Sequence, residues 1–327
     1  MTDQHPGQLL YLSYADVVSV GLTMAEIIDA LEVMFREKGA GRTEMPPKPA
    51  IHPRPPDSFF HPMPAYIPAL DALGVKWVSG YPENYKRGLP YIMGLIVLND
   101  PETGAPLAVM DCTWVTAKRT GAASAVAAKY LARPDSEVVG ILACGVQGRS
   151  NLEALNVVLP LKRVLAYDIN PEVQRKYVEE MSEQLGLEVV PAQEPRQAVV
   201  GCDVVVTSGP VLKKPHATIQ PGWFEVGGFA SLVDYDSYWH PAAIAEADKF
   251  CTDDIAQFEH ERASGYFQGI TVHADLGELA AGLKPGRETP TERTMACNLG
   301  LALDDMATAP LIYRRAVERG IGTWLPL

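Results

Sequence analysis

The spacing of hydrophobic positions changes character near residue 137 of this chain. Before that point, apolar residues at helical spacing follow Thr23, which opens a T-M-A-E capping box and predicts an amphipathic helix closed by Gly39 and Gly41. The stretches GVKWVSGY, YIMGLIVLND and APLAVMD are predicted strands, and an alanine-rich helix is predicted over 117–131. The first part of the chain is therefore expected to be an α+β domain.

A proline-dense tract, MPPKPAIHPRPPDSFFHPMPAY, separates the first helix from these strands. Proline fixes φ and lacks an N–H donor, so the tract is predicted to form neither a helix nor a central strand. Its apolar residues favour an ordered segment draped over the surface.

From Glu137 onward, short apolar runs alternate with helical patterns. Strands are predicted at EVVGILAC, RVLAYDIN, LEVVPA, DVVVTSG, WFEVGG and KFCTDD, and helices from Ser150, over PEVQRKYVEEMSEQLG and over EPRQAVVGC. Runs that are apolar throughout are typical of strands buried on both faces of a parallel sheet. The predicted fold class is α/β: a Rossmann-type doubly wound parallel sheet plus an α+β domain.

The stretch ILACGVQGRSNLEAL contains an incomplete dinucleotide-binding fingerprint. Gly145 and Gly148 supply the last two glycines of G-x-G-x-x-G, while Ala143 replaces the first, which is tolerable if the turn keeps φ negative there. The stretch follows a predicted buried strand and opens a helix, whose N-terminus favours an anion such as a pyrophosphate. The alternative is a strand–helix–strand unit that binds no nucleotide.

An acid at the end of the next strand strengthens the nucleotide interpretation. Asp168 lies 20 residues after Gly148, a spacing suited to a ribose 2′-hydroxyl. Ile169 and Asn170 follow it, with no basic residue for a 2′-phosphate, so NAD is favoured over NADP. The predicted cofactor residues are Gly145, Val146, Gln147, Gly148 and Asp168.

Composition narrows the classes of function. The net charge of −12 argues against nucleic-acid binding, which needs a basic face. No window approaches the roughly 18 unbroken apolar residues of a membrane span, and no secretory signal is visible. Five scattered cysteines without C-x-x-C spacing are typical of reduced thiols, and the lone histidines lack metal-ligand spacing. We expect a cytoplasmic protein with no membrane partner and no metal site.

Several stretches together resemble the ornithine cyclodeaminase/μ-crystallin family. They are GRTEMPPK, GVKWVSGYPEN, AVMDCTWVTAKRTGAASAVAAKYLAR, ACGVQGRSNLEAL, DLGELAAGLKPGR and NLGLALDDM. The third is the most specific when G-V-Q follows it. The resemblance implies a substrate-binding and dimerisation domain from residues 1–125 and 305–327, a NAD-binding Rossmann domain from 126–304, and a homodimer.

The resemblance also implies site residues. Arg42 and Lys76 would hold a substrate carboxylate, and Arg119 would touch both substrate and cofactor, since a small carboxylate needs charged donors to stay in register with a nicotinamide. The alternative for each is a surface cation or a structural ion pair. Further implied positions are Ser208, Gly227, Gly228 and Tyr91 at the cofactor, and Leu299 at the substrate.

Two departures from the family pattern bear on the reaction. The family's aspartate on the substrate amine follows a V-G-G strand end, but here Phe229 follows Gly228, and Asp234 and Asp236 come later. Tyr91 stands where the family has a threonine. Ammonia loss with ring closure needs a proton acceptor for the amine, so the missing acid puts cyclodeamination in doubt.

The sequence therefore predicts NADH-dependent reduction of the imine of a small 2-oxo acid to an L-amino acid, reversible as an amino-acid dehydrogenase. Cations of the proline tract could serve a second carboxylate, as in iminosuccinate and aspartate; they are Lys48, His52, Arg54 and His61. Two alternatives stay open: an ornithine or lysine cyclodeaminase that recruits Asp234 or another acid, and a μ-crystallin-like protein that binds NAD(P)H and a small ligand. Retention of three carboxylate-directed cations argues against a pure binder.

Overall fold

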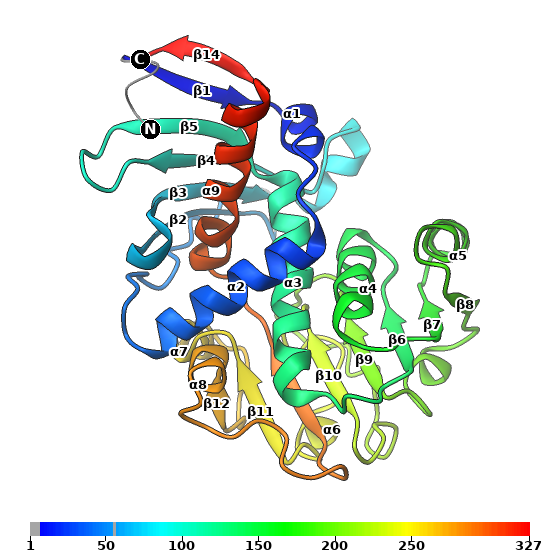
Figure 1. Cartoon of the computed structure of the whole chain (residues 1–327). Coiled ribbons are helices and arrows are strands. Elements are labelled where there is room, and N and C mark those ends of the chain that lie inside the picture. Colours follow the sequence, from blue (N-terminus) through cyan, green and yellow to red (C-terminus); the bar gives the residue numbers. More distant parts are fainter. Residues whose placement is uncertain (1–6, 55–56) are drawn as a thin grey trace. The chain divides into compact units, whose positions relative to one another are not determined.

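The computed structural model describes residues 7–54 and 57–327, so Pro55 and Pro56 of the proline tract lie outside the described residues. The chain divides into two compact units. Unit 1 comprises Met1–Arg119 and Leu301–Leu327, and unit 2 comprises Thr120–Gly300. The division falls inside the long helix α3 (Thr113–Leu131), and each unit has its own sheet (Figure 1).

Unit 1 is built on a six-stranded sheet with the order β14-β1-β5-β4-β3-β2. Its neighbouring strands are antiparallel except for the parallel pair β1 and β5. Helices α2 and α9 pack together, and α9 also packs against β2, β3 and β4 (Figure 1). The elements are β1 (Gln8–Leu12), α1 (Tyr14–Ser19), α2 (Met24–Gly39), β2 (Phe59–Ile67), η1 (Pro68–Leu70), β3 (Ala72–Gly80), η2 (Pro82–Arg87), β4 (Ile92–Asn99), β5 (Pro106–Asp111), α9 (Ala302–Arg319) and β14 (Thr323–Pro326).

Helix α2 begins where the sequence predicts. The Glu26 N–H donates to the Thr23 hydroxyl, and the Thr23 N–H donates to the Glu26 carboxylate at 2.9 Å. This reciprocal pair satisfies two N–H groups that the first helical turn would otherwise leave without partners. Ile27 and Leu31 on the buried face of the helix are fully buried.

The second half of the proline tract forms β2, which is an edge strand of the sheet. This agrees with the prediction that the tract forms no central strand. The N–H groups of Phe60 and Tyr66 point away from β3 and donate to carbonyls of the preceding loop. Pro62 and Pro64 lie between Phe60 and Tyr66 at alternate residues of β2, so their backbone nitrogens also point away from β3. Their missing N–H groups therefore remove no hydrogen bond to β3, which is why prolines are tolerated here.

The two faces of the unit 1 sheet differ in their surroundings. The inner face is buried, and its residues include Met63, Lys76, Val78, Ile96 and Met110. The other face, which we call the outer face, carries Tyr11, Trp77, Leu95, Val97 and Val109. Trp77 lies opposite Leu95 in the register, and Val109 lies opposite both Val97 and Tyr11. Trp77 is 51% exposed, and contiguous exposed apolar side chains of this kind mark an interaction surface.

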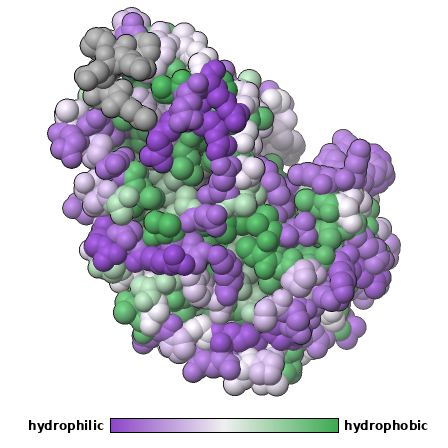
Figure 2. Space-filling view, in the orientation of Figure 1, coloured by the Kyte–Doolittle hydropathy of each residue, from purple (hydrophilic) through white to green (hydrophobic). Residues whose placement is uncertain are grey.

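Unit 2 is an eight-stranded parallel sheet with the order β12-β11-β13-β10-β9-β6-β7-β8. From β6 the chain runs to β7 and β8 on one side and then to β9, β10, β11 and β12 on the other, with β13 inserted between β10 and β11, which confirms the predicted doubly wound sheet. The exposed side of α5 is hydrophilic (Figure 2). The elements are β6 (Val138–Leu142), α4 (Val146–Val158), β7 (Arg163–Tyr167), α5 (Pro171–Leu185), β8 (Glu188–Pro191), η3 (Pro195–Ala198), β9 (Val204–Thr207), β10 (Phe229–Leu232), α6 (Pro241–Ile244), β11 (Lys249–Thr252), α7 (Ile255–Ala263), β12 (Ala274–Asp275), α8 (Leu276–Ala280) and β13 (Thr294–Cys297).

Two predicted helices have different bounds. Helix α4 begins at Val146 rather than Ser150, because Gly145 acts as its N-cap and the loop residues that follow are already helical. The helix predicted over EPRQAVVGC is only the short 3-10 turn η3. It stops before Val199 and Val200, whose branched side chains are poor helix formers, and Gly201 then takes a φ of 79°.

The predicted strand WFEVGG is wrong, and β10 begins only after it. Gly222 and Gly227 take φ values of 79° and 80°, and the Gly228 N–H donates to the Glu225 carbonyl in a turn. Left-handed glycines and a local turn are incompatible with an extended strand. The strand instead covers Phe229–Leu232. The residues at the carboxyl end of this strand are therefore those after Leu232, not those after Gly228.

Candidate active site

Four buried ionisable side chains meet in unit 1, and we call them the charge cluster. Lys76 Nζ lies 2.6 Å from Asp305 Oδ2, Arg119 Nη1 lies 3.2 Å from Asp304 Oδ2, and Arg119 Nε lies 3.4 Å from Asp305 Oδ1. Lys76 is 1% exposed, Arg119 6%, and both aspartates are fully buried. The cluster thus brings together two of the three cations predicted at the site, with two acids that the sequence interpretation missed.

Separate elements hold the members of the charge cluster. Lys76 lies in the middle of β3 on the inner face, and Arg119 lies on α3. Asp304 and Asp305 occupy the first turn of α9, where the helix dipole favours negative charge. Their sequence signal was two adjacent acids that open a helix in the stretch NLGLALDDM.

The acids keep the cluster electrically balanced. Burial lowers the pKa of Lys76 below its usual value, and the neighbouring Arg119 lowers it further, whereas Asp305 acts in the opposite direction. An unpaired buried ammonium would lose its proton, because desolvation of a charge costs several kcal/mol. Asp305 is therefore the group that favours the cationic form of Lys76.

Cys112 lies beside the cluster but has no nucleophilic character. Burial raises the pKa of its thiol to about 11, although the nearby Lys76 partly offsets this. The thiolate, not the thiol, is the reactive form of cysteine. Cys112 therefore packs as a small apolar side chain.

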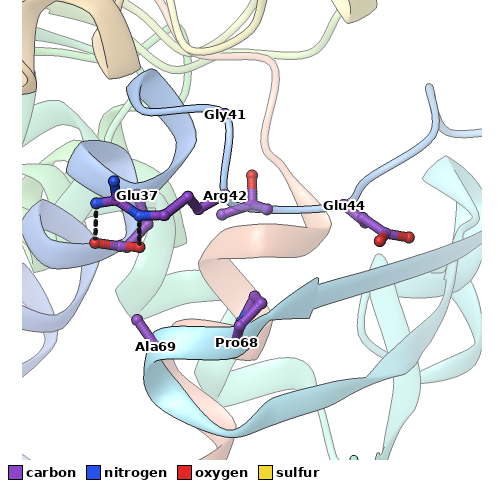
Figure 3. Close-up of a pocket in the computed structure, with 7 residues that line it drawn as sticks. Glu37, Gly41, Arg42, Glu44, Pro68 and Ala69 are labelled. Carbon is purple, nitrogen blue, oxygen red and sulfur yellow. Dashed lines mark hydrogen bonds and ion pairs between the residues drawn. The ribbon is translucent and has the colours of Figure 1, made fainter.

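Arg42 lies apart from these residues, in an open pocket of about 610 Å³ (Figure 3). Its guanidinium makes two hydrogen bonds of 2.7 Å to the Glu37 carboxylate, and its side chain is 60% exposed. The described residues that line the pocket are Glu37, Gly41, Arg42, Thr43, Glu44, Pro68 and Ala69. Neither Lys76 nor Arg119 is among them, so the structure does not bring the three predicted cations together.

The glycine-rich loop of unit 2 has the form of an anion cradle. Gly145 is the N-cap of α4 and brings no side chain to the helix end, and a Cβ added there would meet nothing within 4 Å. A Cβ on Gly148 would lie 2.5 Å from the Ala143 carbonyl oxygen, so only glycine allows this close approach of helix and loop. The first turn of α4 thus presents its N–H groups to open space.

Ala143 replaces the first glycine of the fingerprint, but without the negative φ that would make this replacement tolerable. Its φ is 76°, whereas the sequence interpretation required a negative value. An L-residue in this region costs roughly 1–2 kcal/mol, because its Cβ crowds the backbone. The turn therefore keeps the geometry of a glycine, with strain stored at alanine.

Two other predicted cofactor residues, Asp168 and Ser208, and the predicted substrate residue Leu299 lie at the same edge of the sheet. Asp168 follows β7, and its carboxylate accepts the Cys144 N–H and the Asn170 N–H, both at 2.8 Å. Ser208 follows β9, and its hydroxyl donates to the Ala143 carbonyl at 2.9 Å. Leu299 follows β13 and is buried. The carboxyl ends of parallel strands form the edge where ligands of such folds bind.

Gly227 and Gly228 lie elsewhere. They precede β10 and therefore occupy the amino edge of the sheet. A Cβ on Gly227 would lie 2.4 Å from the Pro290 carbonyl oxygen, so tight packing explains this glycine. We leave both out of the candidate site. Tyr91 belongs to unit 1, where its ring packs edge-on to Phe59 and burial raises the pKa of its phenol.

The corrected strand β10 also changes the interpretation of the missing acid. Asp234 comes two residues after the end of this strand and is fully buried. Its carboxylate accepts the Thr207 hydroxyl at 2.7 Å and the Gly209 N–H at 3.2 Å, and burial raises its pKa to about 7. An acid therefore does follow the strand, two residues after its end, whereas Phe229 is the first residue of the strand.

The described ranges, 7–54 and 57–327, contain neither a candidate metal site nor a candidate membrane span. No group of three or more histidine, cysteine, aspartate or glutamate side chains there could hold a metal ion. No helix in these ranges is long and apolar enough to cross a membrane.

The strain at Ala143 leads to a stability prediction. The substitution Ala143→Gly relieves the positive φ and, after the greater entropy of an unfolded glycine, should raise the free energy of unfolding by up to about 1 kcal/mol. Ala105→Gly, at an exposed loop residue without a positive φ, is the matched control and should lower it by about 0.5–1 kcal/mol. Urea unfolding measures both; an equal loss in the two variants would mean that the turn is unstrained.

Comparisons with known proteins agree over nearly the whole chain. Residues 11–320 match the model of the ornithine cyclodeaminase/mu-crystallin family. An alanine dehydrogenase of Archaeoglobus fulgidus is 37% identical over 326 residues, which cover 97% of this chain and 98% of that protein.

Two solved structures are also similar. The Delta(1)-pyrroline-2-carboxylate reductase of Thermococcus litoralis, in complex with NADH and L-proline, has a TM-score of 0.88 at 37% identity and covers 96% of this chain and 99% of its own. An archaeal alanine dehydrogenase dimer with bound NAD has a TM-score of 0.88 at 34% identity, with coverages of 97% and 99%. The family predicted from the sequence is confirmed. This chain belongs to the ornithine cyclodeaminase/mu-crystallin family.

Proposed function

We propose that this protein reduces the imine of a small 2-oxo acid to an L-amino acid with NADH, and that the reaction is reversible. The predictions of an oxidoreductase acting on C–N bonds and of NAD as cofactor are confirmed by the relatives, which are an amino-acid dehydrogenase and an imine reductase, the latter with NADH bound. The observation that carries the proposal is the charge cluster, whose buried cations suit a substrate carboxylate.

The described residues of unit 2 fit a bound NAD. The open space above Gly145 accommodates a pyrophosphate against the helix N-terminus, where a side chain would block it. Asp168 provides the acceptor for a ribose hydroxyl, and no basic residue follows it directly. NADH supplies the hydride for the imine carbon when it is bound.

In this proposal the residues of unit 1 hold and polarise the substrate. The Lys76 ammonium has three N–H donors, of which one faces Asp305 and the others can serve a carboxylate. Arg119 adds a planar guanidinium that is fixed by Asp304. Charge-assisted bonds from both orient the reacting carbon and exclude water from it.

A second candidate, a cyclodeaminase acting on ornithine or lysine, gains support from Asp234. A buried carboxyl with a pKa of about 7 can take a proton from an amine near neutral pH. Both of its oxygens already accept hydrogen bonds, however, which ties the group to the loop after β9. The greater similarity to a dehydrogenase and a reductase favours reduction.

The finer proposal of iminosuccinate as substrate has support from the proline tract. Lys48 and His52 both act electrostatically on His61, which lies on β2 near the inner face. The Lys48 ammonium suits a second carboxylate, whereas His61, with a pKa lowered to about 4, does not add the positive charge that the sequence suggested.

We also propose that a second copy of the chain covers the outer face. This face is a continuous apolar surface across four strands, and one of the similar solved structures is a dimer.

The reaction is tested by NADH consumption with pyruvate, glyoxylate, oxaloacetate or Δ1-pyrroline-2-carboxylate, the oxo acids with and without ammonia. Oxidation of NADH that needs both oxo acid and amine, or that occurs with the cyclic imine, is expected. Ornithine and lysine with NAD are run beside them. Ammonia release from these without net NADH formation would establish the cyclodeaminase instead, and NADH binding without any turnover would establish a binder.

The balance within the charge cluster predicts a pH effect. Asp305→Asn removes the group that raises the pKa of Lys76, so Lys76 should lose its proton at lower pH and the alkaline limb of kcat/KM should move down by about one pH unit or more. Asp304→Asn is the matched control, because Asp304 pairs with Arg119, which does not titrate in this range. If the alkaline limb of kcat/KM lies at the same pH in both variants, Lys76 is not the titrating group.

The outer face predicts an effect on assembly. Trp77→Glu places a charge among exposed apolar side chains and should convert a dimer to monomers in sedimentation velocity. Leu283→Glu, at an exposed leucine of unit 2, is the control and should leave the dimer intact. A monomeric wild type, or a Trp77→Glu dimer, would contradict the assignment of this face.

A further inference from the structure

His61 lies next to the charge cluster on the sheet of unit 1. In the register of β2 and β3, His61 is opposite Val78 and Met63 is opposite Lys76. His61 and Lys76 are therefore diagonal neighbours on the inner face, at a separation that side chains of this length can bridge. The Phe59 ring packs against the imidazole with 4.8 Å between centroids, and Phe59 in turn lies over Gly80, where a Cβ would clash with it.

The tautomer of His61 is fixed by its backbone partner. Nδ1 lies 2.9 Å from the Pro49 carbonyl oxygen, which can only accept, so Nδ1 carries the hydrogen. In the neutral ring the lone pair is then on Nε2. Within residues 7–54 and 57–327, no group donates a hydrogen bond to Nε2.

The surroundings keep this ring neutral. Burial is the main cause that lowers the pKa of His61 to about 4, and electrostatic interactions with Lys48, Lys76 and His52 lower it further. The hydrogen bond to Pro49 opposes this only in part. Across neutral pH, His61 thus presents an acceptor in a region that otherwise presents cationic donors.

An acceptor and a cation side by side match the two ends of an imino acid. The carboxylate suits the ammonium, while an imine or amine nitrogen that bears hydrogen needs an acceptor. A 2-oxo acid presents an oxygen lone pair at that position, which an Nε2 lone pair repels. The pair therefore distinguishes C=N–H from C=O.

We propose that His61 Nε2 accepts a hydrogen bond from the substrate nitrogen while Lys76 binds the substrate carboxylate, which makes His61 a determinant of specificity for nitrogen-bearing substrates. This inference rests on the proposed function. A site that hydrogen-bonds one substrate group discriminates strongly against analogues that lack it, because its own polar group is then left unpaired.

Two substitutions separate this role from a structural one. His61→Asn retains a donor for the Pro49 carbonyl but lacks an atom at the position of Nε2, and it should lower kcat/KM for imine reduction about 10- to 100-fold. His61→Gln carries its amide oxygen further out and should recover most of that loss. Both should bind NADH like the wild type. If His61→Asn keeps full activity, or if both variants lose activity equally, the proposal is wrong.

A measurement on the wild type separates the proposal from the proposed function. Imidazole ¹⁵N NMR of the holoprotein should show an Nδ1–H tautomer from pH 5.5 to 8, and L-alanine, L-proline or L-aspartate should shift the Nε2 resonance. His61→Gln assigns the signal. A shift without turnover of any imine would refute the proposed reaction but retain the His61 contact. No shift with any of the three amino acids would overturn the contact, even if imines are reduced.

Discussion

The ion pair between Lys76 and Asp305 constrains much of unit 1. An ammonium on the inner face of a sheet would cost several kcal/mol without a partner, and its acid comes from the far end of the chain. Arg119 and Asp304 pair across 185 positions in the same way. The last helix must therefore return to the first sheet, so unit 1 cannot be a continuous segment.

Unit 2 depends on a different constraint, the close approach of backbone to backbone at one sheet edge. Gly148 has no side chain because the Ala143 carbonyl occupies its space, and Ala143 takes a left-handed φ to place that carbonyl. Ser208 and Asp168 then hold the loop from the two neighbouring strands. The loop is thus braced before any ligand arrives, which reduces the ordering that binding requires.

Local signals allowed the sequence to predict most elements, and long-range pairs account for most of what it missed. Patterns among neighbouring residues predict the capping box at Thr23, the apolar strands of unit 2 and the loop at Gly145. The partners of Lys76 and Arg119 are not, because no local pattern connects β3 or α3 to the first turn of α9. Two acids at the start of a helix are ordinary capping residues in sequence terms.

The wrong strand prediction over WFEVGG affected the predicted site more than the missed partners of Lys76 and Arg119 did. WFEVGG has the apolar content of a strand, but Gly222 just before it and Gly227 within it take positive φ values, and the segment is a loop. The strand therefore begins at Phe229, and the residue taken as the replacement for an acid is the first of the strand. Asp234 then takes the place at the carboxyl edge. A shift of a few residues in the strand bounds changes which residue lies at the ligand-binding edge, because ligands in this fold bind at the carboxyl ends of the strands.

On the inner face of unit 1, two neighbouring groups are subject to the same effect of burial but differ in what opposes it. Desolvation lowers the pKa of both Lys76 and His61, since it disfavours the charged form of each. Lys76 has Asp305 to oppose that effect, whereas His61 has only a carbonyl and faces further cations. The first therefore remains a donor and the second becomes an acceptor. A substrate with a carboxylate and a nitrogen-bound hydrogen is the complement of that pair, and neither side chain alone would select it.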